Sequence, residues 1–575
     1  MIRLTPGRRL AALVFAMACA IGVAACGSGT GSGTSTPAAS STNAAVSVKS
    51  GGTITYALDE DLDGFNINYA NDDEEMLQEV IDNVWPKVFV PTPSLKLALD
   101  TDVVTSATVT KTSPQTVVYQ INPKATWSDG VPISAADFIY NWQAQSGNPK
   151  YKDKGGAAFL PTSTAGYNQI KSVTGSDGGK TVTVVFSSPF GDWQSLFNDL
   201  VPAHIGEKYG WNNGFQNFGP AVEVSGGPYE IASYTQGEDL VEVPNPKWWG
   251  TKPKLSKIIF RFILDDNQIP AAIQNGEVQL AEPALASLSF KDAVAGIPNT
   301  TTDVIAGLEF QHIDFNQANP YLALSDVRHA IADGTNREQM VQRIVSPLTT
   351  SIQPLENHIW MPIQPQYQNT SGSYGDFSVA EAKKLLEASG MTMGSDGYFH
   401  PNFGPEKNQD FTLSIATTSG VEVRSQIEQL FQADMKAIGV KITIANYSAN
   451  TLFGTVGPKG EFDLIEFAWV QTPFASGTQS IYCSYTDASV CGENWDHYSD
   501  PQVDKLYNEA LGTINAAQAA NLYNQIDSLL WKDMATLPLF EQPDLYTWST
   551  SYGNIEPDPS NNDVPWNAYA WGLKA

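Results

Sequence analysis

The sequence predicts a mixed α/β protein in which helices and strands alternate along the chain. Segments with apolar residues at every second position, typical of strands, alternate with segments that carry them at every third or fourth position, typical of helices. The chain has 575 residues, of which 42% are hydrophobic and 11% aromatic, which is enough to bury a large core. No internal repeat with a period of about 20–50 residues recurs, which argues against solenoids and propellers.

The predicted strands come first. Residues 51–58 alternate between polar and apolar side chains and read as the first strand of the body. Residues 116–121 and 181–186 show the same alternation. The second of these follows the turn residues Asp177, Gly178 and Gly179, so the Gly179-Lys180-Thr181 sequence is interpreted as a hairpin turn and not as part of a phosphate-binding loop.

Two helices are indicated by capping residues. Ser134 precedes the first, with Asp137 at the third helical position. Ser378 and Glu381 form the pattern of a capping box for the second, and Gly390 stands where a left-handed residue would end it.

Further helices are expected in the C-terminal half of the chain. Apolar residues from Ile427 to Ile438 mark one helical face that Gly439 ends, and the next residues, 440–444, alternate as a strand. Asp500-Pro501 predicts a helix start, and residues 521–534 carry a second apolar face.

The N-terminus has the pattern of a secretion signal. Arg3, Arg8 and Arg9 precede an apolar stretch from Leu10 to Val23, which is too short to span a hydrocarbon core of about 30 Å. The following Val-Ala-Ala-Cys-Gly resembles the bacterial lipobox, in which the cysteine is lipidated and the chain is cut before it. We therefore expect residues 1–25 to be a lipoprotein signal peptide and Cys26 to be the lipidation site. The alternative is an ordinary signal peptide with an incidental cysteine.

A tether and a disulfide follow from composition. Residues 26–50 are rich in Gly, Ser, Thr and Ala, and such a segment is expected to be a flexible linker between a lipid anchor and the body. Cys483 and Cys491 remain as an even pair in an extracytoplasmic chain, which favours a disulfide. A metal site is less favoured there, because His497 is the only nearby histidine and no CxxC motif exists.

Charge and motifs exclude several function classes. The chain has 61 acidic and 33 basic residues, a net charge of −28 that argues against binding nucleic acid or docking electrostatically on anionic lipid. No HExxH or G-x-S-x-G motif is present, and the histidines form no close ligand pair in the sequence. The acidic runs 59–63 and 72–75 lack calcium-loop spacing and are interpreted as solvated surface. Paired carboxylates for glycoside hydrolysis stay open as an alternative, because 61 acids form many accidental pairs. The sequence therefore gives no positive evidence for an enzyme, and we expect no cofactor and no metal.

Several motifs then occur in a familiar order. Residues 118–142 contain a strand, a W-S-D-G-x-P turn and a helix, and they are followed by five further motifs. These are Gly226–Tyr229 with Pro244–Trp249, Asn275–Val278, Ser325–Glu338, Ala380–Gly390 and Leu537–Leu539. From about Gly51 to its C-terminus the chain thereby resembles family 5 solute-binding proteins of ABC importers, the group that includes oligopeptide- and dipeptide-binding lipoproteins.

This resemblance implies a two-lobed periplasmic-binding-protein-like fold of type II, in the large family 5 variety with an extra small subdomain. The ligand cleft would lie between the lobes. Lobe I would comprise residues 51–308, with the small subdomain at about 95–200, and lobe II residues 309–540. Residues 541–575 would return to lobe I. Long strands near 304–315 and 537–546 would carry the crossings between the lobes.

The resemblance also implies a function. The protein would be a non-enzymatic monomer, anchored by lipid on the extracytoplasmic face of the bacterial membrane. It would deliver a peptide or peptide-like solute to ABC permease subunits with a cytoplasmic ATPase, without a cofactor. Two alternatives remain open: the same fold binding an oligosaccharide or glycoconjugate, or serving a regulatory role without transport, and a secreted hydrolase.

The ligand residues are mapped from the same resemblance. Residues 462–474 are similar to the family segment in which an Asp holds the ligand ammonium, but Thr472 stands at that position and carries no charge. Glu466 or Glu309 could replace it, or the ligand is not a standard peptide. Trp469 suits stacking on a ligand, with lobe II core as its alternative role. The full set of expected ligand residues is Tyr69, Asn71, Phe310, Gln311, Trp360, Trp469, Gln471, Thr472 and Phe474.

Overall fold

The computed structural model describes residues 45–575 except 73–74, 284, 486–490 and 561–563. The predicted signal peptide and the lipidation site Cys26 lie outside the described residues. The described part of the chain belongs to one compact unit. None of its helices combines the length and apolar character needed to cross a membrane.

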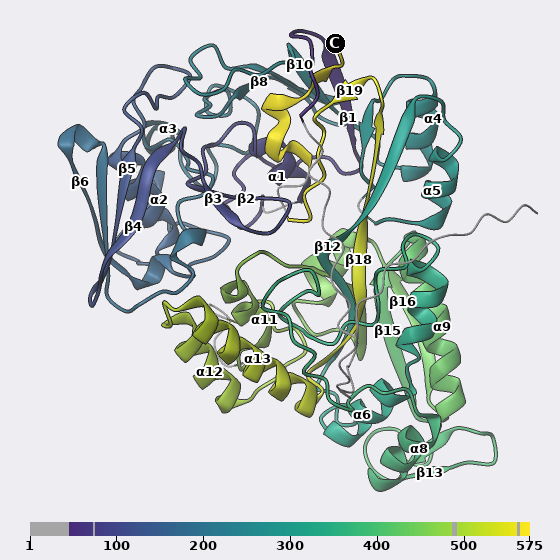
Figure 1. The fold of residues 1–575 in the computed structure, drawn as a ribbon. Helices are drawn as coiled ribbons and strands as arrows, with labels where there is room; N and C mark the ends of the chain where they lie inside the picture. Colours follow the sequence, from purple (N-terminus) through teal and green to yellow (C-terminus); the bar gives the residue numbers. More distant parts are fainter. Residues whose placement is uncertain (1–44, 73–74, 284, 486–490, 561–563) are drawn as a thin grey trace, which may run out of the picture. The chain divides into compact units, whose positions relative to one another are not determined.

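A ten-stranded mixed sheet is the centre of the fold. In spatial order its strands are β16 (Lys441–Tyr447), β15 (Thr412–Thr418), β17 (Leu464–Val470), β12 (Thr300–Phe315), β18 (Thr536–Ser549), β11 (Leu280–Ala281), β1 (Thr53–Leu58), β10 (Lys257–Phe262), β9 (Asp239–Pro244) and β8 (Tyr229–Thr235). The long strands β12 and β18 run side by side through the middle of the sheet (Figure 1). They pair antiparallel from Thr300 opposite Ser549 to Asp314 opposite Thr536, with a register shift between Ala306 and Phe310. Both long strands expected from the sequence are therefore confirmed.

A separate antiparallel sheet contains β4 (Val104–Thr112), β5 (Gln115–Ile121), β7 (Thr181–Phe186) and β6 (Ile170–Ser176), in that order. Helix α2 (Ala135–Gln145) contacts β6 and β7. The Ser134 backbone N–H donates to Asp137, and the Ser134 hydroxyl accepts from the helix, so the predicted capping box is confirmed. The strands predicted at 116–121 and 181–186 are β5 and β7.

The remaining elements are short or cover the large sheet. The helices are α1 (Glu75–Ile81), α3 (Ala203–Tyr209), α4 (Ile269–Gln274), α5 (Leu288–Val294), α6 (Ser325–Gly334), α7 (Arg337–Met340), α8 (Val379–Ala388), α9 (Glu422–Ile438), α10 (Ala449–Thr451), α11 (Gln479–Tyr482), α12 (Pro501–Leu511) and α13 (Ala516–Asp533). The short strands are β2 (Phe89–Pro91), β3 (Leu97–Leu99), β13 (Met391–Met393), β14 (Phe399–Pro401), β19 (Tyr552–Gly553) and β20 (Gly572–Leu573).

The buried apolar residues form separate cores. The largest draws on residues between 54 and 280 together with residues 546–571, so both ends of the body contribute to it. Another draws on residues between 313 and 540 and is covered by α6, α8 and α9. Helices α12 and α13 have their own cluster, which includes Trp360. Each core is thus assembled from segments far apart in the sequence.

The helix ends follow the sequence signals closely. The Ser378 hydroxyl accepts from the backbone of Glu381 at the start of α8, and Gly439 ends α9 in the left-handed region with φ 86°. Asp500 caps α12 as predicted. Helix α13 begins earlier than the apolar pattern indicated, because Asn515 supplies a side-chain cap to Gln518.

Two expectations about surface segments are wrong. Asp72 is not solvated surface: its carboxylate is buried and accepts hydrogen bonds from the Asn66 backbone and from Gln216 Nε2. Burial raises its pKa, and the bond from Gln216 opposes this. The C-terminal end of the expected flexible linker is not free either, because it is hydrogen-bonded to the C-terminal part of the chain. The Val46 N–H donates to Asn554 Oδ1, and the Lys49 N–H donates to the Leu573 carbonyl.

Candidate functional site

Three residues form a row across the crossing strands. Phe310 on β12 lies directly opposite Trp469 on β17 and, on its other side, directly opposite Glu541 on β18. Directly opposed residues of antiparallel strands point to the same face with Cβ atoms about 5 Å apart. The Trp469–Phe310–Glu541 row therefore places a carboxyl group beside two aromatic rings.

The row is covered by apolar side chains from other segments. Phe310 packs in a small cluster with Leu308, Leu355 and Met361, and Trp469 and Tyr367 pack against it. Leu95, from the turn between β2 and β3, reaches the same cluster. The covering residues thus come from both the N-terminal and the C-terminal halves of the chain.

Glu541 is the charged member of this group. It is 2% exposed, and its Oε1 atom has no hydrogen-bond partner among the described residues. Burial raises its pKa to about 8. Tyr367 lies within electrostatic range of it: burial raises the tyrosine pKa to about 12, and the carboxylates of Glu356, Asp527 and Glu541 contribute to that rise. A buried carboxyl without a partner costs free energy unless a cation or a donor satisfies it.

Three other polar atoms near the row are also buried without a hydrogen-bond partner. Trp360 Nε1, Trp469 Nε1 and Gln471 Nε2 are buried and have no hydrogen-bond partner within the described part of the chain. Trp360 is 5% exposed and packs edge-on against Tyr523 of α13, so most of its ring belongs to the helical core. Trp469 is half-buried and stacks on His312 at 5.8 Å.

Glu309 and Glu466, the two carboxylates that the sequence suggested as replacements for the anchoring Asp, do not belong to the row. Glu309 lies opposite Val470, and Glu466 lies opposite Ile313, so both occupy the face of the sheet opposite to Trp469. Burial raises the pKa of each to about 7, while the charge of Arg424 lowers both. Glu466 also accepts a 2.7 Å hydrogen bond from Thr417. These groups form their own network with Arg424.

Thr472 is exposed and its hydroxyl is engaged locally. It accepts from the backbone N–H of Phe474 at 3.2 Å and donates to the Phe474 carbonyl at 3.1 Å, which closes a tight turn after β17. Phe474 itself is half-buried. The position where the family resemblance places an anchoring Asp is therefore a turn residue in this chain.

The other expected ligand residues are placed separately. Gln311 is fully buried on the Glu309 face, and its Nε2 donates to Gln542 at 3.2 Å. Tyr69 is buried and accepts from exposed Asn71, and their segment pairs with residues 160–162. Among the described residues, no hydrogen bond or ring contact joins Tyr69 or Asn71 to the row. The structure thus brings Phe310, Trp469 and Gln471 together and leaves Tyr69 and Asn71 apart.

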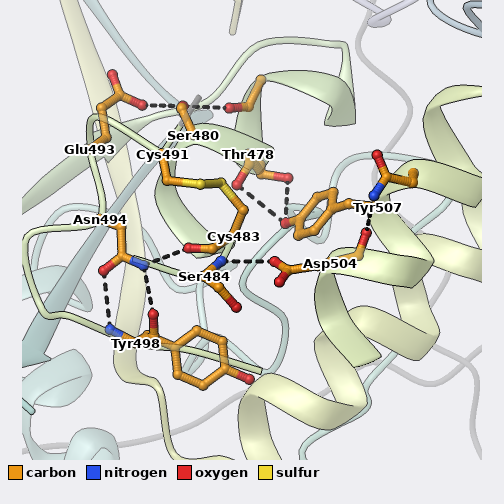
Figure 2. The surroundings of a disulfide bond; sticks show 12 residues. Thr478, Ser480, Cys483, Ser484, Cys491, Glu493, Asn494, Tyr498, Asp504 and Tyr507 are labelled. Carbon is orange, nitrogen blue, oxygen red and sulfur yellow. Dashed lines mark hydrogen bonds between the residues drawn. A yellow bond between two sulfur atoms is a disulfide. The ribbon is translucent and has the colours of Figure 1, made fainter. Parts of the chain in front are cut away.

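The predicted disulfide between Cys483 and Cys491 is present (Figure 2). Asn494 braces it: its Nδ2 donates to the carbonyls of Cys483 and Tyr498, and its Oδ1 accepts from the Tyr498 backbone. The Ser484 N–H donates to Asp504 of α12. The disulfide segment is thereby attached to α12, and it follows the turn that carries Phe474.

The segment before α11 also contacts the region of the four-stranded sheet. The Ser476 N–H donates to Asp192 Oδ2 at 3.1 Å, and the Gly191 N–H donates to the Leu511 carbonyl at 2.7 Å. Burial raises the pKa of Asp192, and the bonds from Ser476 oppose this. These contacts join residues that lie far apart in the sequence, 284 positions apart in the case of Ser476 and Asp192.

Two other features lie away from the row. Asp396, His400 and Asp410 are close together, with His400 Nε2 2.9 Å from Asp396 Oδ2. Lys441 Nζ lies 3.2 Å from Asp410, so this group already has a cationic partner. A pocket of about 240 Å³ between α5 and α9 contains none of the expected ligand residues.

Comparison with known proteins identifies the family of this chain. Residues 99–489 match the family model described as bacterial extracellular solute-binding proteins, family 5 Middle. The chain belongs to this family. Family 5 proteins are solute-binding proteins, and the two-lobed α/β fold expected from the sequence is confirmed.

Individual relatives agree with this assignment. The oligopeptide-binding protein OppA of Mycobacterium tuberculosis (strain ATCC 25618 / H37Rv) is 28% identical over 504 residues, covering 86% of this chain and 81% of the relative. A probable monoacyl phosphatidylinositol tetramannoside-binding protein, LpqW, of the same organism is 28% identical over 404 residues, covering 68% of this chain and 61% of the relative. The solved structure of the periplasmic EDTA-binding protein EppA has a TM-score of 0.85 at 26% identity, covering 92% of this chain and 98% of that one.

Sequence reasoning did not single out Glu541 as a candidate ligand residue. It directly follows the apolar run Leu537–Phe540 of a strand expected to cross between lobes, and a charged residue next to such a run in a buried strand is unusual. That signal was available, but the strand register that places Glu541 beside Phe310 was not.

Proposed function

We propose that this chain is the lipid-anchored substrate-binding protein of an ABC importer. It captures a peptide or peptide-like solute between two lobes and delivers it to membrane permease subunits served by a cytoplasmic ATPase. The observation that carries the proposal is the Trp469–Phe310–Glu541 row, because it places stacking surfaces and a carboxyl group on the strands that cross the centre of a family 5 fold. The similarity to an oligopeptide-binding protein supports the peptide class.

The proposal includes an arrangement of domains. Lobe I comprises residues 51–308 with the small subdomain at about 95–200, lobe II residues 309–540, and residues 541–575 return to lobe I. The protein acts as a monomer without catalysis or cofactor, and Cys26 carries its lipid on the extracytoplasmic face. The ligand set expected from the sequence is kept as part of the proposal, with the residues around Phe310 and Trp469 at its centre.

A second candidate is a glycoconjugate-binding or regulatory protein with the same fold. It is favoured by the similarity to LpqW, whose name assigns it a mannoside lipid, and by Thr472 at the position of an anchoring Asp. Aromatic rings such as Trp469 also stack on sugar faces.

Native mass spectrometry of the full chain, purified in detergent from its host, tests the two candidates. The released ligand is then identified under denaturing conditions. A ladder of peptide masses supports the peptide-binding function. A single sugar-containing mass favours the second candidate. If the purified protein turns over a peptide or glycoside, and the turnover is lost when one carboxylate is replaced, the binding-protein proposal is wrong.

A further inference from the structure

Glu541 has no structural role visible in its surroundings. Among the described residues no ion pair includes it, and no hydrogen bond reaches its buried Oε1 atom. Some buried acids of this chain are satisfied, as Asp527 is by His358 and Asp72 is by Gln216. Glu242 is buried without a hydrogen-bond partner among the described residues, as Glu541 Oε1 is, so the aromatic neighbours on its own face are what set Glu541 apart. A side chain that costs free energy in the empty protein and is flanked by aromatic rings has the character of a binding group.

We propose that Glu541 anchors a positively charged group of the solute, an ammonium or a guanidinium, and that Trp469 and Phe310 flank that group. The inference rests on the proposed function, since it requires the solute to lie against the crossing strands. The anchor is then Glu541 on β18, in place of the Asp that the resemblance puts at position 472, in the turn after β17.

The chemistry of the row fits a cation. A carboxylate in an apolar site forms strong charge-assisted hydrogen bonds with ammonium or guanidinium donors. Aromatic faces attract the same cation through their quadrupoles, which contributes about 0.5–2 kcal/mol when water is excluded. The net charge of −28 raises the local concentration of cationic solutes further.

The other acids near the crossing strands do not offer the same site. Glu466 and Glu309 lie on the opposite face and share the positive charge of Arg424, which competes with any ligand cation. Asp544 lies three residues after Glu541 on β18, opposite Ile305 and beyond the register shift. Asp314 of β12 lies on the same face as Phe310 by alternation, but His312 Nε2 lies 3.3 Å from its Oδ2 atom. Glu541 is thus the carboxyl group that lies directly opposite Phe310 in the strand pairing.

The test compares two probes of equal shape and different charge, phenethylamine and 2-phenylethanol. Their dissociation constants are measured calorimetrically near pH 8 on the full chain in detergent, on Glu541→Gln and on the matched control Glu309→Gln. We expect the wild type and Glu309→Gln to prefer the amine at least tenfold. Glu541→Gln should bind both probes equally. An amine preference that is absent in the wild type, or that persists in Glu541→Gln, overturns the proposal.

A second measurement uses the unaltered protein, so it stands even if Glu541→Gln does not fold. Carbodiimide couples bound phenethylamine to the carboxyl group it contacts, and peptide mass mapping locates the resulting amide. Label on Glu541 supports the proposal, whereas label confined to Glu309, Glu466 or surface acids overturns it.

The two proposals fail in different ways. If the amine preference depends on Glu541 but native mass spectrometry finds only sugar-containing ligands, the peptide-binding function is wrong and the cation subsite stands. If peptides co-purify and the amine preference is missing, the cation subsite alone is wrong.

Discussion

Phe310 of β12 and Glu541 of β18 are directly opposed across the two strands that run through the centre of the large sheet. One is fully buried and the other almost so. A phenyl ring and a carboxyl group with no hydrogen-bond partner for its Oε1 atom among the described residues therefore share one face in the middle of the large sheet. The predictions below concern this face and the contacts that hold it.

Replacing Trp469 by alanine should weaken solute binding by about 1–3 kcal/mol, the usual scale for an aromatic anchor at a binding site. The reason is that its ring stands at the end of the row with Phe310. Calorimetric titration with the solute identified by native mass spectrometry measures the loss. Trp469→Phe is the control and should retain part of the affinity. Unchanged affinity with lowered thermal stability would make Trp469 a core residue only.

The empty protein should lose stability as the pH rises from about 4.5 to about 8. The pKa of Glu541 is raised to about 8, and those of Glu309 and Glu466 to about 7, in each case mainly by burial. A carboxyl group whose pKa is higher in the folded than in the unfolded state stabilises the fold fully below its unfolded pKa, and this stability is lost as the pH passes through the folded value.

The Glu541→Gln variant isolates one part of that pH dependence. Each pKa unit corresponds to about 1.4 kcal/mol, so the variant should remove on the order of 3–4 kcal/mol of the change between pH 4.5 and 9. Urea unfolding at several pH values measures it. Glu387→Gln, at an exposed position of α8, is the control and should follow the wild type. If the free energy of unfolding of Glu541→Gln changes with pH in the same way as that of Glu387→Gln and the wild type, Glu541 does not have the raised pKa given above.

Replacing Asp192 by alanine should speed solute release. Asp192 accepts from the Ser476 backbone and so ties the region of the four-stranded sheet to the segment that follows β17. Loss of a hydrogen bond to a charged group costs about 1.5–3 kcal/mol, and we expect the dissociation rate to rise about tenfold. Stopped-flow Trp fluorescence measures this rate. Asp177→Ala, in the turn between β6 and β7, should leave it unchanged.

Removal of the disulfide by Cys483→Ser with Cys491→Ser should lower the free energy of unfolding by about 2–3 kcal/mol, because the bond closes a short loop in the unfolded chain. Chemical denaturation compares the two forms. Because Asn494 braces the segment independently, the folded structure should persist. A variant with wild-type stability would show that the bond contributes little beyond these hydrogen bonds.

Replacing Cys26 by alanine should move the protein from the membrane fraction to the soluble fraction, since the lipobox pattern makes this residue the only expected anchor. Fractionation and intact-mass measurement check both localisation and lipid. A membrane-bound variant of unchanged mass would mean that another part of the chain is the anchor.

Local elements were predictable because their signals are local. The caps of α2, α8 and α12 and the left-handed Gly439 all follow from a few neighbouring residues, whereas the long strands β12 and β18 were expected from the family resemblance. The family also followed from motifs that each lie within a short segment. Asp72 was misjudged, because its burial depends on Gln216, far away in the sequence.

The sequence by itself determined the fold class, the disulfide and the residue types available for binding. Periodicity, cysteine count and short motifs can be recognised without knowing which distant residues are in contact. Only the tertiary structure decided which of those residues meet. Alternation along β12 and β17 sends Glu309 and Glu466 to one face and Phe310 and Trp469 to the other, and the shifted pairing with β18 brings Glu541 to the second. A displacement of one residue in register would exchange the two faces, and that register is set by packing over the whole sheet.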